Sequence, residues 1–318
     1  MQTMVTDSPE KAAHFINDGG IVAFPTETVY GLGAAICHPE AVLRIFLAKG
    51  RPPDNPLIVH VARPEDVLKV ADHIGSDAEK LIRRFFPGPL TIVLKKNSNV
   101  PDSVTAGLDT VGVRCPSNPD AHSFLQHCRC PVAAPSANLS GKPSSTSWRA
   151  VLEDLDGKID CLFRGEPSAI GLESTIVDCS GPTPRLLRTG AVSMEELRSV
   201  VGALETSDCL LTDETPRSPG LKYPHYAPAA RVVLCGSREP VTTPPGVRAA
   251  YIGLSVPEAG GLSLSRICRT PDEYARMLFD FFRLCDSRRI AVIYCELPPE
   301  EGIGRAIRDR LDRAASGH

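Results

Sequence analysis

Residues 21–61 read IVAFPTETVYGLGAAICHPEAVLRIFLAKGRPPDNPLIVHV and hold two apolar segments on either side of a polar turn and a helical segment. Residues 21–24 form a short apolar run between a glycine pair and Pro25, which predicts a buried strand. Polar groups follow where this strand ends, and they belong to Thr26, Glu27, Thr28 and Tyr30. Gly31 and Gly33 would let the backbone approach a ligand or adopt positive φ. Such a turn is typical of a pocket wall.

A helix is predicted to begin at Pro39, where a missing N–H costs little, and to end at Gly50. Lys49 and Arg51 flank this glycine, where the helix gives way to an extended segment. Two cations separated by one residue can project to the same side of an extended chain, and together they would suit a polyanion. The alternative is a solvated pair that complements the dipole at the helix C-terminus.

The chain has 318 residues and a formal net charge of -3. This length predicts two domains. The charge gives no overall basic field of the kind that drives tight nucleic-acid binding. The N-terminal residues lack a signal-peptide pattern, and no apolar run approaches the ~18 residues of a membrane span. We therefore expect a soluble, cytoplasmic protein without a membrane partner.

The chain contains 11 cysteines, an odd number spread along its length. This pattern favours reduced thiols over a disulfide framework. Cys128 and Cys130 form the one close pair, and without a second pair or histidines at zinc-site spacing they are a weak metal signal. The sequence thus predicts free cysteines and no metal site.

Helical and strand patterns alternate along the rest of the chain, with capping-box patterns at Ser76, Ser193 and Thr270. His60 lies inside a predicted strand and is either packed in the core or exposed to the pocket. Arg114 ends another predicted strand and is either a ligand-binding or an ordinary surface arginine.

Two polar segments repeat the pattern of the first turn. Residues 135–146 read PSANLSGKPSST after an apolar strand, which is either a flexible loop or a row of binding groups at the C-terminal edge of a sheet. Residues 171–180 read GLESTIVDCS and again place hydroxyls beside a strand. The candidate binding groups from these segments and the strand that follows are Ser136, Asn138, Ser174 and Arg188.

We predict a first domain at residues 1–204, a proline-rich linker at 205–230 and a smaller βα domain at 231–318. The linker is rich in aromatic residues for a spacer, and its prolines would reduce the entropy lost on docking. It is therefore expected to cover the pocket as a lid, the alternative being an ordered tether. The lid side chains would be Tyr223, His225 and Tyr226.

Several common catalytic motifs are absent from the sequence. Gly141-Lys142 is not part of a P-loop, the 31–36 segment lacks the third glycine of a dinucleotide fingerprint, and GxSxG, HExxH and CxxC do not occur. What remains is a pocket with four candidate cations and several neutral hydroxyl and amide groups. This set suits phosphates together with a carboxylate.

The motifs PTETVYGLG, KGRP, PLIVHV, VRCP, PSAN, STIVD and LLRTG occur in this order. Together they resemble the YrdC-like family of L-threonylcarbamoyl-adenylate synthases over residues 7 to about 203. The linker SPGLKYPHYAP and the following domain are similar to the longer, two-domain members. The resemblance implies an α/β fold: a YrdC-like twisted mixed sheet with helices around a concave cationic pocket, plus a smaller Rossmann-like domain.

The resemblance also implies a nucleotidyltransferase that converts L-threonine, bicarbonate or CO2 and ATP into threonylcarbamoyl-AMP and pyrophosphate. Lys49 and Arg51 would be catalytic, and Mg²⁺ would arrive on ATP rather than in a protein-built site. Phosphates would be bound by Lys49, Arg51, Ser136, Asn138, Ser174 and Arg188. Threonine would be bound by Thr26, Tyr30, His60 and Arg114.

The product of such an enzyme would pass to the machinery that forms threonylcarbamoyladenosine beside the anticodon of tRNA. Tight direct binding of tRNA is not expected. The alternative function is an RNA-binding module for double-stranded RNA or tRNA without catalysis, which the acidic chain with 5% aromatic residues disfavours. A carbamoyl-adenylate enzyme is a further alternative, but the zinc-knuckle and acylphosphatase-like segments of such proteins are absent.

Overall fold

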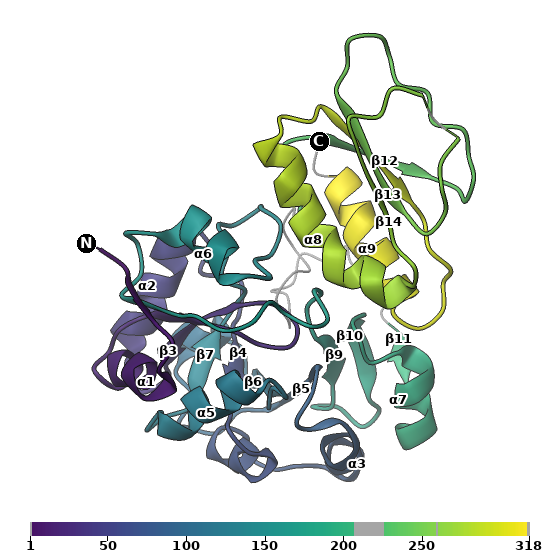
Figure 1. Ribbon diagram of the computed structural model, residues 1–318. Coiled ribbons are helices and arrows are strands. Elements are labelled where there is room, and N and C mark those ends of the chain that lie inside the picture. The colour runs from purple at the N-terminus through teal and green to yellow at the C-terminus, as the bar shows by residue number, and fades with distance from the viewer. Residues whose placement is uncertain (1, 207–225, 259, 317–318) are drawn as a thin grey trace.

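The computed structural model describes residues 2–206, 226–258 and 260–316, and Figure 1 shows two sheets with helices packed on them. Among these residues the larger sheet has 11 strands in the order β1-β8-β2-β3-β7-β4-β6-β5-β9-β10-β11. It is mixed: β4 and β6 run parallel, whereas β7 lies antiparallel to both β3 and β4. The predicted mixed α/β fold is confirmed.

The strands of the large sheet are β1 (Met4–Thr6), β2 (Val22–Phe24), β3 (Gly31–Ala35), β4 (Ile58–His60), β5 (Leu90–Lys95), β6 (Thr110–Arg114), β7 (Val132–Ala134), β8 (Cys161–Phe163), β9 (Thr175–Asp178), β10 (Arg185–Arg188) and β11 (Glu205–Thr206). The helices between them are α1 (Pro9–Asn17), α2 (Pro39–Lys49), the 3₁₀ helix η1 (Pro64–Lys69), α3 (Ser76–Phe85), α4 (Asp102–Thr105), α5 (Pro119–His127), α6 (Trp148–Leu155) and α7 (Met194–Val201).

Both faces of this sheet are covered, because alternate residues of a strand point to opposite sides. Val22 and Phe24 of β2 pack in the same apolar cluster as α1 and α5. Ala23 instead belongs to the main core, which includes buried residues of α2, α3 and α7. The short β2 run is therefore wholly buried, as its uninterrupted apolar sequence predicts.

The smaller sheet is entirely parallel, with the order β12-β15-β13-β14. Its strands are β12 (Arg231–Cys235), β13 (Ala249–Gly253), β14 (Leu264–Ile267) and β15 (Val292–Glu296), and its helices are α8 (Pro271–Ser287) and α9 (Gly304–Ala315). A parallel sheet with crossover helices is the arrangement expected of a Rossmann-like domain. The boundaries predicted at residues 204 and 230 stay predictions.

The two sheet domains meet through α8. Val29 and Leu172 of the first domain lie in the apolar cluster of the second. Gly171 has φ +84°, and a Cβ atom there would lie 2.5 Å from Cα of Arg276 in α8. Only glycine permits this backbone-to-backbone approach, so the contact between the domains is closely packed.

Most predicted helix ends are confirmed. Ser193 and Thr270 accept hydrogen bonds as N-caps, and Gly50 ends α2 with a left-handed φ of 61°. Ser8 likewise caps α1. The cap predicted at Ser76 is wrong, because Gly75 occupies the N-cap position and Ser76 is already helical. The role predicted for Gly33 is also wrong: a Cβ there would meet Val132 at 2.5 Å, so close packing in the core requires this glycine.

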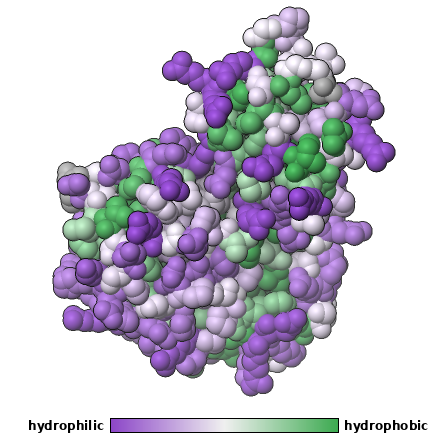
Figure 2. All heavy atoms as spheres, in the orientation of Figure 1, coloured by the Kyte–Doolittle hydropathy of each residue, from purple (hydrophilic) through white to green (hydrophobic). Residues whose placement is uncertain are grey.

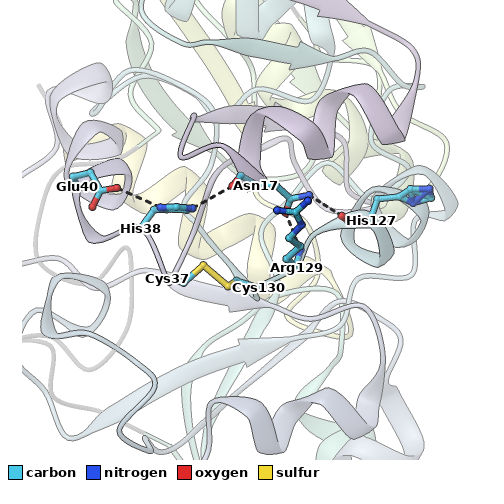
Figure 3. Close-up of a disulfide and its surroundings, with 7 residues drawn as sticks. All are labelled: Asn17, Cys37, His38, Glu40, His127, Arg129 and Cys130. Carbon is cyan, nitrogen blue, oxygen red and sulfur yellow. Dashed lines mark hydrogen bonds and ion pairs between the residues drawn. A yellow bond between two sulfur atoms is a disulfide. The ribbon is translucent and has the colours of Figure 1, made fainter.

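The structure joins Cys37 and Cys130 in a disulfide, which contradicts the expectation of reduced thiols at these two positions (Figure 3). The antiparallel pairing of β3 with β7 explains their proximity. Ala35 pairs with Val132, and continuing this register by two residues places Cys37 opposite Cys130. Nearby, the Asn17 side chain donates to the carbonyl of His127 and accepts from the backbone N–H of Arg129 (Figure 3).

The face shown in Figure 2 is mainly hydrophilic, with several separate hydrophobic patches. Within residues 2–206, 226–258 and 260–316, no helix combines the length and apolarity needed to cross a membrane.

Candidate active site

A pocket lies against one face of the large sheet. The space within it is about 710 Å³, counting the part open to solvent. Ile58 and His60, alternate residues of β4, form part of its floor. The predicted residues that line it are Thr26, Tyr30, Lys49, Arg51, His60, Arg114, Ser136, Asn138, Ser174, Arg188 and Tyr226.

The sequence pattern suggested that these groups gather at one edge of a parallel sheet, but in the structure they do not. Ser136 follows β7, and β7 runs antiparallel to β4. Ser136 and His60 therefore come from opposite ends of neighbouring strands. They line one pocket because the pocket extends across the sheet face rather than along an edge.

Lys49 is the last residue of α2, and its side chain reaches across to the loop after β7. Its Nζ donates to the carbonyl oxygen of Ser136 at 2.6 Å and to that of Asn138. Lys49 is only 2% exposed. Burial lowers the pKa of Lys49 well below its usual range, and the positive charge of Arg51 lowers it further.

Arg51 follows the left-handed Gly50, so the chain turns sharply between the two cations. The Arg51 guanidinium donates to the carbonyls of Asn55 and Pro56, the latter at 3.1 Å. Both cations are buried, which argues against the alternative of a solvated pair. A polyanion in this pocket would meet two desolvated positive charges.

The loop after β7 is fixed by its own hydrogen bonds. The Asn138 amide donates to the carbonyls of Leu139 and Lys142, at 2.8 and 2.9 Å. Its Oδ1 is buried and has no hydrogen-bond partner among the described groups. The loop is therefore an ordered wall rather than the flexible segment that its composition also allowed.

A second side of the pocket is formed by the turn after β2. The Thr26 hydroxyl donates to the carbonyl of Val29 at 2.6 Å and accepts the backbone N–H of Thr28. Tyr30 exchanges hydrogen bonds between its hydroxyl and the backbone of Gly165, at 2.9 and 3.1 Å. Both hydroxyl groups thus hold the turn in shape.

Arg114 ends β6 and lies beneath this turn. Its guanidinium contacts Glu27 Oε1 at 2.7 Å and donates to the Thr28 hydroxyl at 2.7 Å. The Arg114 side chain is 5% exposed, which excludes the alternative that Arg114 is an ordinary surface arginine. The Arg114 guanidinium is thus held in a fixed position by Glu27 and Thr28.

The sequence left open whether His60 packs in the core or faces the pocket, and in the structure it does both. Its ring packs edge-on against Phe24 at 5.7 Å between ring centroids, and it also lines the pocket. Burial lowers the pKa of His60 to about 3, with a further contribution from Arg114. His60 is therefore neutral near pH 7.

Ser174 and Arg188 form a third group of polar side chains. The Arg188 guanidinium donates to the carbonyl of Ser174 at 3.0 Å and to its hydroxyl at 3.2 Å. The Ser174 hydroxyl also shares a hydrogen bond with Thr91 at 2.7 Å. Burial lowers the pKa of Arg188 from its ordinary value, and the positive charge of Arg310 contributes.

Of the three predicted lid residues, Tyr223 and His225 lie outside the described residues. Tyr226 lines the pocket, stacks on Phe279 with 5.3 Å between ring centroids, and has a left-handed φ of 71°. The backbone N–H of the next residue, Ala227, donates to the carbonyl of Gly141 at 3.1 Å. This end of the linker is therefore attached to the pocket loop.

Sequence reasoning missed several lining residues, namely Lys142, Ser144 and Glu173. Ser144 was visible within the hydroxyl-rich segment, and Glu173 stands next to Ser174. Neither has a local pattern that separates it from a solvated side chain. In the described residues, no group of three or more His, Cys, Asp or Glu side chains is arranged to hold a metal ion.

A family model described as telomere recombination matches residues 14–190, and one described as the C-terminal domain of threonylcarbamoyl-AMP synthase matches residues 192–316. The chain is 43% identical to the threonylcarbamoyl-AMP synthase of Pyrococcus abyssi, covering 96% of this chain and 93% of that relative. It is 40% identical to the Bacillus subtilis protein of the same name, covering 98% and 94%.

The crystal structure of Pyrococcus abyssi Sua5 complexed with L-threonine matches with a TM-score of 0.90 and 38% identity, covering 99% of this chain and 97% of that one. Escherichia coli YciO matches with a TM-score of 0.51 and 23% identity over 59% of this chain and 93% of that one, which shows a shared fold alone.

These likenesses, with the mixed sheet and its pocket, define a two-domain α/β enzyme of the nucleotidyltransferase class. The chain belongs to the threonylcarbamoyl-AMP synthase family. This membership favours the enzymatic hypothesis over the RNA-binding one.

Proposed function

We propose that this protein is an L-threonylcarbamoyl-adenylate synthase, which uses L-threonine, bicarbonate or CO2, and ATP. The single observation that carries the proposal is the convergence of four buried cations on one pocket, in a chain with full-length relatives of that name. Phosphates and a carboxylate account for such a set. The solved relative with bound L-threonine supports the amino-acid substrate.

The proposed reaction begins when the threonine amine adds to CO2 and loses a proton, which gives a carbamate. A carbamate oxygen then attacks the α-phosphorus of ATP, a new P–O bond forms, and the bond to the bridging oxygen breaks with its electron pair leaving on pyrophosphate. This step needs alignment and neutralisation of charge rather than an enzyme nucleophile.

The phosphate-binding groups in this proposal are Lys49, Arg51, Ser136, Asn138, Ser174 and Arg188. Lys49 and Arg51 have the central role because both cations are buried and line the same pocket. Phosphate would restore the proton affinity that burial takes from Lys49. Mg²⁺ would enter as part of the ATP substrate and neutralise further phosphate charge.

Threonine would bind near the turn after β2, through Thr26, Tyr30, His60 and Arg114. Arg114 is the proposed partner of the threonine carboxylate, because its guanidinium is fixed by Thr28 and Glu27. Thr26 and Tyr30 would act by shaping the turn, since their hydroxyls bond to its backbone and to Gly165. Neutral His60 would pack against the bound amino acid without competing for its carboxylate.

The linker is proposed to shield the product, a mixed anhydride that water hydrolyses. Tyr226 supports this because its side chain lines the pocket and is 5% exposed. Excluding water from a labile intermediate is a known use of closing segments. The product would then pass to a cytoplasmic tRNA threonylcarbamoyl-transferase machinery, without tight binding of tRNA by this chain.

The test is the dependence of pyrophosphate release on each substrate. The purified protein is mixed with ATP and Mg²⁺, and threonine and bicarbonate are omitted in turn. Release should require both together, and related amino acids such as serine should give less. Equal release without threonine would show that the pocket supports a different reaction.

A further inference from the structure

Arg310 is a fully buried arginine that the proposed reaction does not use. It lies on α9 in the second domain, where its Nη1 contacts the neighbouring Asp309, and it also has two partners in the first domain, one of which, Glu173, lines the active-site pocket. Its Nε contacts Glu173 Oε2 at 3.0 Å, and its Nη2 donates to the carbonyl of Thr189 at 3.0 Å. Its side chain is 0% exposed. Such burial of a charge is costly unless the charge is matched, and here it is matched by Asp309 on the same helix and by Glu173 across the domain boundary.

Glu173 is the centre of this contact and lines the pocket. One carboxylate oxygen accepts from the Ser144 hydroxyl, and the other contacts Arg310. Burial alone would raise the pKa of Glu173, but the positive charges of Arg310 and Arg188 outweigh it and lower that pKa. Glu173 is therefore an anion within the field of two arginines.

The charge balance of this cluster matters for a phosphate ligand. Asp309 pairs with both Arg310 and Arg313, so three arginines (Arg188, Arg310 and Arg313) face two carboxylates (Glu173 and Asp309), and the cluster carries a net charge of about +1 near pH 7. Without Arg310, Glu173 would be left to cancel the charge of Arg188, and the sum would fall to zero. The part of the pocket wall formed by Arg188 and Glu173 would then carry no net positive charge, although every lining side chain would still be present.

Tyr226 keeps Arg310 in place from the linker side. The Arg310 guanidinium carbon lies 5.4 Å from the centroid of the Tyr226 ring, which in turn stacks on Phe279 of α8. A cation over an aromatic face is attracted to it, more strongly where water is excluded. The second domain and the linker therefore hold one charge against the pocket wall.

We propose that Arg310 is a positioning residue for nucleotide binding: by pairing with Glu173 it prevents this carboxylate from neutralising Arg188 at the phosphate site. The inference rests on the proposed function, since it takes Arg188 to be a phosphate-binding group. It assigns the second domain a role in the active site, namely to keep the pocket wall cationic.

The test compares equilibrium binding of ATP and of L-threonine in variants of the full chain. Arg310→Met should weaken ATP binding by about tenfold or more, which corresponds to about 1.4 kcal/mol. Threonine affinity should change by less than about twofold, because Arg114 and its turn do not contact Arg310. Arg310→Lys retains a charge beside Glu173 and should recover most of the ATP affinity.

The double variant Arg310→Met with Glu173→Gln separates this electrostatic role from simple domain attachment. Removing the carboxylate should restore ATP affinity to within about threefold of the original protein. If Arg310 only joins the domains, the double variant will bind ATP no better than the single one, and the inference fails. Glu173→Gln alone should tighten ATP binding, which keeps the idea testable if Arg310→Met does not fold; weaker binding of both ligands would refute it.

Arg308→Met is the matched control, since Arg308 lies on the same helix and contacts Glu300 and the carbonyl of Pro298 within the second domain. It should leave both affinities unchanged, and an equal loss of ATP binding there would also refute the inference. Failure of the original protein to bind ATP would instead overturn the proposed function. The two failures are therefore distinguishable.

Discussion

Replacing Lys49 with methionine removes the buried cation while keeping a side chain of similar length. In the structure the ammonium group is bound by the carbonyls of Ser136 and Asn138 and is shielded from water. A contact between such a desolvated charge and a phosphate oxygen is not weakened by solvent as a surface pair would be. A hydrogen bond to a charged group contributes about 1.5–3 kcal/mol.

The expected loss follows from this magnitude. About 2.7 kcal/mol of lost transition-state stabilisation corresponds to about a hundredfold decrease in turnover. Lys49→Met should therefore reduce kcat/KM for ATP by about a hundredfold, measured as pyrophosphate release with saturating threonine and bicarbonate. Arg51→Ala should give a loss of similar size, because its guanidinium is also buried.

Lys80→Met supplies the control for this experiment. Lys80 is an exposed residue of α3 whose ammonium contacts Asp77 at 2.8 Å, and such surface pairs contribute little. Its activity should equal that of the original protein. If folded Lys49→Met, checked by thermal unfolding, retains turnover within about threefold, the assigned role of Lys49 is wrong.

Three further predictions concern the remaining parts of the site and fold. Arg114→Met should raise the KM for threonine by about ten- to a hundredfold through loss of a charge-assisted contact; an unchanged threonine KM would remove Arg114 from the substrate site. Because burial lowers the pKa of Lys49 and the protonated amine binds phosphate, ATP affinity should fall as pH rises through that lowered pKa. Lys49→Arg should abolish this fall, and an identical pH profile in the variant would contradict the assignment. Cys37→Ser opens a loop that spans 93 residues and should lower the free energy of unfolding by about 2–5 kcal/mol; equal denaturant midpoints for variant and original under oxidising conditions would exclude a stabilising bond.

Local sequence patterns were sufficient for the elements that carry most of the site. The buried strand β2, the end of α2 at Gly50 and the polar segments after β7 all follow from short-range rules on apolar runs, glycine and proline. The four cations could be named because each stands at a predicted break between elements. That the four cations share one pocket was inferred from their chemistry. The mixed strand directions place this pocket on the face of the sheet rather than at its edge.

The parts that could not be predicted depend on contacts between distant segments. Cys37 and Cys130 are adjacent only because β3 and β7 pair in one particular register. Arg310 on α9 reaches Glu173 because the second domain packs on the first, with α8 lying against Gly171. The sequence near these residues does not encode the two contacts, because strand register and domain packing are set by the whole fold.

The most direct measurement is mass analysis of the product formed with carbon-13 bicarbonate. The protein is incubated with ATP, Mg²⁺, L-threonine and labelled bicarbonate, and the nucleotide products are separated at once, before the mixed anhydride hydrolyses. The account predicts threonylcarbamoyl-AMP that carries the heavy carbon, formed in equal amount with pyrophosphate. Pyrophosphate accompanied by an adenylate of threonine without the labelled carbon would contradict the central claim.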